Sequence, residues 1–86
     1  MSQIGQVIDT LNRTANNADE VGDLLRRAQS DLDSIRDRMR LVLADSQAPE
    51  VARAHGVSAA TADYLMQAQS ALMMAGQHAR HRAATL

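Results

Sequence analysis

The sequence predicts an all-α protein in which a long heptad-patterned helix, a short helical connection and a second, antiparallel helix form a helical hairpin or, by oligomerisation, a bundle. Apolar and small residues recur along most of the chain at alternating spacings of three and four, which is the period of one helix face. The chain has one Pro and four Gly among 86 residues, and its Ala- and Leu-rich composition favours helix over strand. We expect a single helical domain, residues 1–86, without a sheet.

The first helix is predicted at about residues 3–44, with Ser2 as its N-cap. Asn16, Asn17 and Gly22 are poor helix formers, but the heptad phase runs through them unchanged, which favours one continuous helix. Heptad position a holds Ile4, Leu11, Ala18, Leu25, Leu32 and Met39, and position d holds Val7, Thr14, Val21, Ala28, Ile35 and Val42.

A connection is predicted at about residues 45–58. Pro49 suits the first turn of a short helix at about 49–54, Gly56 suits a C-terminal stop, and Ser58 suits the N-cap of the next helix. This last helix is expected at about 59–83, with Leu65, Ala68, Leu72, Ala75 and Ala79 at the same alternating spacing.

A last helix of this length would be about 15 residues shorter than the first. Each residue of a helix adds roughly 1.5 Å, so the last helix would end well before the start of the first. Its antiparallel packing would then leave Ile4 to Leu11 uncovered, and an uncovered apolar end predicts a partner.

The apolar residues cover more surface than one hairpin can bury. Tyr64, Met66, Met73 and Met74 flank the line through Leu65 and Leu72, and two hairpins in a four-helix bundle would bury so wide a face. We therefore expect a homodimer or a complex with another helical protein. The candidate partner interface consists of Ile4, Val7, Ile8, Leu11, Val21, Leu25, Leu32, Ile35, Met39, Val42, Leu65, Met66, Leu72 and Met73.

Charge and composition disfavour several other classes of function. The net charge of -1 gives no basic surplus for nucleic acid or an anionic membrane. The chain has no Cys and no Gly-rich phosphate loop, and His78 and His81 lack an evident third metal ligand. We expect no catalytic residue, cofactor, metal or small-molecule substrate.

The localisation expected from the sequence is cytoplasmic. Met1 to Leu11 lacks the basic start and apolar core of a signal peptide. No run approaches the roughly 20 apolar residues that span a bilayer.

Residues Val51 to Leu65 read VARAHGVSAATADYL and resemble the bacterial helix-turn-helix pattern, in which a first helix carrying V-A-R ends at G-V-S. This resemblance implies a turn at Gly56 to Ser58 and a second helix that enters the DNA major groove. The exposed positions of that second helix would be Ala59, Ala60, Asp63 and Tyr64, which include no Arg or Lys for phosphate or base edges.

In length and shape the chain also resembles the helical-hairpin substrates of type VII secretion systems and small Ala-rich, Arg-rich hairpin proteins of GC-rich bacteria. The Trp-X-Gly turn of the secretion substrates is absent, and Ala68 stands where their export signal has an acid. The resemblance to the secretion substrates implies dimers and export that is independent of a signal peptide.

These observations favour a non-catalytic protein-protein interaction module, whether an adaptor, a subunit or a small secreted-type partner, assembling through coiled-coil-like seams. The alternative is a DNA-binding regulator that uses Val51 to Leu65 as a helix-turn-helix and the long first helix as its dimeriser.

Overall fold

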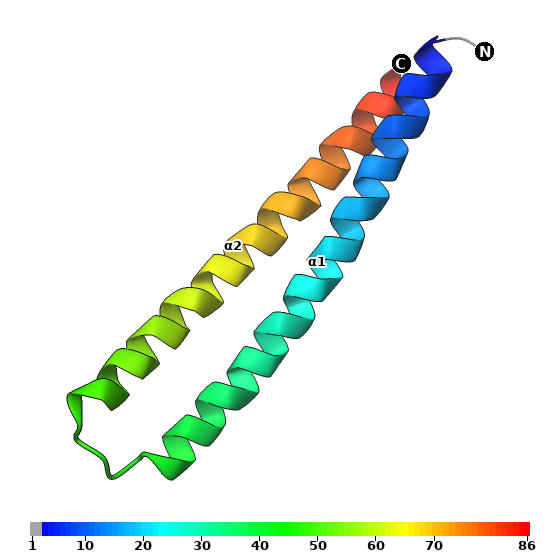
Figure 1. The fold of residues 1–86 in the computed structure, drawn as a ribbon. Helices are drawn as coiled ribbons and strands as arrows, with labels where there is room; N and C mark the ends of the chain where they lie inside the picture. The colour runs from blue at the N-terminus through cyan, green and yellow to red at the C-terminus, as the bar shows by residue number, and fades with distance from the viewer. Residues whose placement is uncertain (1–2) are drawn as a thin grey trace.

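A computed structural model describes residues 3–86, which form two long helices, α1 (Gln3–Val42) and α2 (Pro49–Thr85). The helices lie antiparallel, with the connection at one end and both termini at the other (Figure 1). The hairpin measures 66 × 15 × 14 Å along its principal axes. The described residues contain no strand, so the predicted all-α helical hairpin is confirmed.

Helix α1 is continuous over 40 residues, including Asn16, Asn17 and Gly22. The unbroken heptad phase outweighs the weak helix propensity of these three residues, because most of a helix's stability in a protein comes from packing along its apolar face. The N-cap predicted at Ser2 lies outside the described residues.

The connection is shorter than the sequence predicts. The backbone N–H of Ser46 donates to the carbonyl of Leu43 (3.0 Å) just after α1 ends. Ala48 has an extended backbone, φ -62° and ψ 136°, because the ring of a following proline disfavours the helical region. Pro49 then begins α2, where its missing N–H costs no hydrogen bond.

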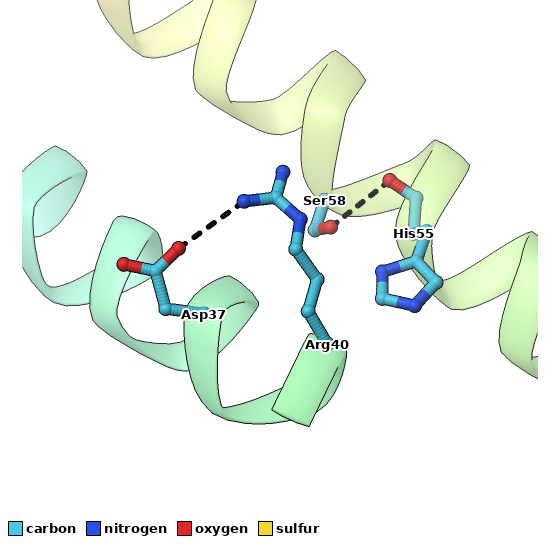
Figure 2. A network of polar contacts seen from close by, with 4 residues as sticks. All are labelled: Asp37, Arg40, His55 and Ser58. Carbon is cyan, nitrogen blue, oxygen red and sulfur yellow. Dashed lines mark hydrogen bonds and ion pairs between the residues drawn. The ribbon is translucent and has the colours of Figure 1, made fainter. Parts of the chain in front are cut away.

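Helix α2 runs without a break through Gly56 and Ser58, so the stop at Gly56 and the separate helices at about 49–54 and 59–83 are wrong. The Ser58 hydroxyl donates to the carbonyl of His55 (3.0 Å) within the helix instead of capping a new one (Figure 2). The Thr61 hydroxyl likewise donates to the carbonyl of Val57 (2.8 Å). Such bonds to the preceding turn are typical of Ser and Thr inside helices. No glycine in the described part of the chain has a positive φ.

The continuous α2 covers more of α1 than the sequence predicts. With 37 residues against 40, its end lies beside the first turns of α1 (Figure 1). Ile8 and Leu11 are half-buried, so the prediction that they are uncovered is wrong. Ile4 and Val7 remain 56% and 47% exposed.

One line of residues on each helix faces the other helix, and we call these two lines the seam. Their members follow one another at alternating spacings of three and four, as expected for two helices that pack along their length. On α1 and just after its end, the buried and half-buried residues of this line are Ile8, Leu11, Ala15, Ala18, Gly22, Leu25, Gln29, Leu32, Arg36, Met39 and Leu43. On α2 they are Val51, His55, Ser58, Ala62, Leu65, Gln69, Leu72, Gly76, Ala79 and Ala83.

The helices approach most closely near the termini, where the seam residues are small. Ala15 is fully buried, and a Cβ atom added to Gly76 would lie 3.7 Å from the Ala15 carbonyl oxygen. Toward the connection the seam contains Leu32, Met39 and Leu43, and the two helices spread apart (Figure 1). Side-chain size along the seam therefore sets the spacing between the helices.

Polar contacts between the helices fix their register. The Gln69 amide Nε2 donates to Gln29 Oε1 (2.6 Å) within the seam. Nearer the termini, the Arg80 guanidinium donates to Asn16 Oδ1 (3.2 Å) and to the Asp19 carboxylate. A slip of either helix by one residue would break these bonds, so they select one alignment, as polar residues in helical seams do.

Replacement of Gly56 tests the continuity of α2. The space around Gly56 is open to 4 Å, so Gly56→Ala should stabilise the protein by about 0.5–1 kcal/mol, the cost of Gly inside a helix. Gly22→Ala, also in open space within α1, is the matched control and should give a similar gain. The measurement is urea unfolding followed by circular dichroism. A loss of stability for Gly56→Ala alone would show that Gly56 ends a helix.

Replacement of the two seam glutamines tests the register contact. Gln29→Leu or Gln69→Leu alone leaves the other amide half-buried without its partner and should cost about 1–2 kcal/mol. The double variant should cost clearly less than the two single variants together, since neither amide remains. A double-mutant cycle of unfolding free energies measures this coupling; additive losses would contradict the contact.

Candidate interaction surface

The hairpin has almost no enclosed core. In residues 3–86 the buried positions are Ala15, Ala62, Gly76 and Ala83, and no large side chain is fully buried. Larger seam residues such as Leu25 and Leu65 are half-buried. Two helices side by side therefore bury little apolar surface. The side chains that flank the seam on each face determine what else the hairpin can contact.

One face of the hairpin can be assigned from contacts between the helices. A shallow groove of about 590 Å³ is lined by Asp19 and Arg26 of α1 and by Ser70 and Met73 of α2. Arg80, seven residues after Met73, contacts Asp19. These flanks of the two helices therefore share one face.

The flank that carries Asp19 and Arg26 is strongly charged, and we name this side of the hairpin the charged face. Residues seven apart on a helix lie in line along its axis, so the remaining members follow from the heptad. Ion pairs along α1 join Asp23 to Arg26 (3.0 Å) and Asp37 to Arg40 (3.1 Å; Figure 2). The nine charged residues of this face are Asp9, Asp19, Asp23, Arg26, Asp33, Asp37, Arg40, Asp63 and Arg80.

The flanks on the other side of the seam form the opposite face, which we name the apolar face. Leu24, Val57 and Tyr64 are 60%, 66% and 71% exposed there. The same heptad reading places only three charged residues on this side, Asp31, Arg38 and Arg82. The apolar residues of this face are Val7, Val21, Leu24, Ala28, Ile35 and Val42 of α1 and Val57, Tyr64, Ala68, Ala71 and Ala75 of α2, and uncharged polar residues such as Thr14, Asn17, Thr61 and His78 lie on the same lines.

The line of α1 that faces α2 differs in part from the one that the sequence predicts. Position a faces α2 as predicted, but its companion line is Ile8, Ala15, Gly22, Gln29 and Arg36, each one residue after a d position. The d line therefore points to the apolar face. The hydrophobic pattern favours the d line as the second line of the seam, because the residues of the observed companion line are mostly small or polar. Close approach at Ala15 and the amide pair at Gln29 make it the better seam.

The residues proposed from the sequence as the partner interface divide into three groups. Those half-buried in the seam are Ile8, Leu11, Leu25, Leu32, Met39, Leu65 and Leu72. Those exposed on the apolar face are Val7, Val21, Ile35 and Val42. Met66 and Met73, 55% and 57% exposed, lie on the charged face, and Ile4 is exposed near the start of α1.

Several residues of the apolar face were absent from the sequence prediction. Leu24 and Val57 lie outside the predicted a and d lines, and the sequence pattern indicates Tyr64 only as a neighbour of Leu65. The width of the apolar band, with Val21, Leu24 and Leu25 within one turn, is the signal that could have found Leu24.

Residues 51–65 lie within one continuous helix, so the turn of a helix-turn-helix is not formed there. His78 and His81 are exposed on α2, and the described residues include no group of three potential metal-ligating His, Cys, Asp or Glu side chains. Neither α1 nor α2, as far as they are described, is long and apolar enough to cross a membrane.

Comparison with known proteins gives no relative for this chain: no family model, curated protein or solved structure matches it.

Adjacent residues of α1 test the assignment of the two lines. Leu32 is half-buried in the seam, whereas Ile35 is 49% exposed on the apolar face. In dilute solution, Leu32→Ala should lower the unfolding free energy by about 1–3 kcal/mol through lost packing, and Ile35→Ala should change it by no more than about 0.5 kcal/mol. Denaturant unfolding at micromolar protein concentration measures both changes in unfolding free energy. Equal losses would show that Ile35 and the d line pack in the seam as Leu32 does.

Proposed function

We propose that this chain is a non-catalytic protein interaction module, an adaptor or subunit, that binds a helical partner through its apolar face in a coiled-coil-like packing. The observation that carries the proposal is the difference between the two faces of the hairpin. The charged face has nine charged residues and the apolar face region has three. A solvated surface needs no such segregation, whereas a partner surface does.

The shape of the apolar face suits a helical partner. Its apolar residues follow α1 at heptad spacing from Val7 to Val42, along a molecule 66 Å long. A long shallow band of this kind matches the side chains of another helix or helix pair, which insert between residues three and four apart. Tyr64 adds a large amphipathic side chain, of the type enriched at protein interfaces.

The weak core supports the same role. A hairpin in which only Ala and Gly positions are buried among the described residues gains little hydrophobic stabilisation alone. A partner on the apolar face would bury Leu24, Ile35 and Tyr64 and so add the apolar burial that the hairpin lacks. The proposal therefore links binding to stability.

Two exposed residues of α2 provide a matched test. Tyr64 lies on the apolar face and Met66 on the charged face, 71% and 55% exposed. The immobilised chain is exposed to a tagged copy of itself and to a lysate of its source cells. Tyr64→Glu should reduce capture about tenfold or more, since a buried unpaired carboxylate costs several kcal/mol. Met66→Glu should leave capture unchanged. Equal effects of both variants, with helicity retained, would contradict binding through the apolar face.

A further inference from the structure

We propose that the partner on the apolar face is a second copy of this chain, packed face to face with its connection at the opposite end of the bundle. This inference rests on the proposed function and specifies its partner. The product would be a four-helix bundle in which each α1 lies antiparallel to the other α1 and each α2 to the other α2.

The exposed area of the hairpin matches the needs of a stable dimer. The chain exposes 6567 Å², whereas a compact folded chain of 9.3 kDa is expected to expose about 5,000 Å². The excess is about 1,600 Å² per chain, or about 3,200 Å² for a pair, within the roughly 2,000–5,000 Å² of obligate dimer interfaces. One further hairpin on one face is therefore of the right size.

The apolar face is complementary to itself when two copies are related by a two-fold axis near Val21 and Leu24. A two-fold interface requires that each residue and its opposite number suit each other in both directions. With the axis there, Leu24 of one copy packs against Val21 of the other, and the full length of α1 overlaps. The contacts Gln29–Gln69 and Asn16–Arg80 place residues 73–76 of α2 at the same level, so Ala75 lies near the axis, where Ala71 of the second copy would face it.

The three charged residues on this side select the antiparallel arrangement. Seven-residue steps from the axis bring Asp31 opposite Thr14 of the second copy and Arg82 opposite Tyr64. These neighbours offer a hydroxyl to the carboxylate and an aromatic ring to the guanidinium. Arg38 would lie opposite Val7, near the end of the bundle, where its long side chain reaches water.

The alternative two-fold axis runs along the bundle and places both connections at the same end. It sets each α1 against the α2 of the other copy, with Asp31 level with Tyr64 and Arg38 level with Val57. In this arrangement the Tyr64 hydroxyl would donate to the Asp31 carboxylate and Arg38 would again lie near an end of the bundle. Arg82, however, would lie near Thr14 and lose the aromatic ring of Tyr64. The distribution of charge therefore favours the antiparallel dimer.

Analytical ultracentrifugation of the purified chain tests the dimer. The expected mass is twice 9.3 kDa. Leu24→Glu should raise the dissociation constant of the dimer about tenfold or more, because it buries a charge near the axis. Met73→Glu, on the charged face, should leave the dissociation constant unchanged. A monomer throughout the micromolar to millimolar range would overturn this inference. If Tyr64→Glu still abolished capture from lysate in that case, the proposed function would stand with a different partner; if Tyr64→Glu and Met66→Glu had equal effects, the proposed function itself would fail.

Single cysteines distinguish the two arrangements, since the chain has no Cys of its own. A short thiol-specific crosslinker should join Leu24→Cys chains near the axis, with Val21→Cys as a second reporter there. It should not join Val42→Cys chains, because the two connections would be separated by most of the roughly 60 Å length of a 40-residue helix. Crosslinking of Val42→Cys chains would overturn the antiparallel arrangement. Circular dichroism confirms that each variant remains helical.

Discussion

Two helices lying side by side can bury only one line of side chains on each helix, and this constraint governs the whole molecule. Side chains beside that line stay exposed whatever their polarity, because residues 3–86 contain no third helix to cover them. The buried positions of the described chain are consequently three Ala residues and Gly76, while Leu24 and Tyr64 remain mostly exposed. The fold thus uses part of the apolar surface that the sequence encodes and leaves the rest on one face.

The line that α1 turns toward α2 is not its most apolar one. Ala15 on this line and Gly76 opposite it let the backbones approach, so van der Waals contact compensates for the smaller apolar area. Gln29 is tolerated because Gln69 satisfies its amide oxygen. Arg36 is less well accommodated, since its Nε atom is buried without a hydrogen-bond partner within the described residues. Polar groups of this kind fix register at some cost in stability.

The two faces of the hairpin differ in polarity: the charged face is suited to water and the apolar face to contact with another apolar surface. On the charged face, ion pairs such as Asp23–Arg26 are largely exposed and contribute only a few tenths of a kcal/mol each, so their effect is mainly to keep this side in water. The continuity of α2 through Gly56 extends both faces along the molecule. A break there would have left the connection end of the apolar face, around Val42 and Val57, without a regular neighbour.

The sequence by itself determined the helical class, the length of α1 and the position of Pro49, because these depend on local propensity and on a period that one chain segment contains. It also determined that the apolar residues exceed what one hairpin buries. Only the tertiary structure decided that Gly56 and Ser58 continue a helix and which line of α1 forms the seam, with Val21 and Ile35 left on the outer face. Those outcomes depend on how closely two backbones can approach and on whether Gln29 meets Gln69, and neither is a property of one helix alone.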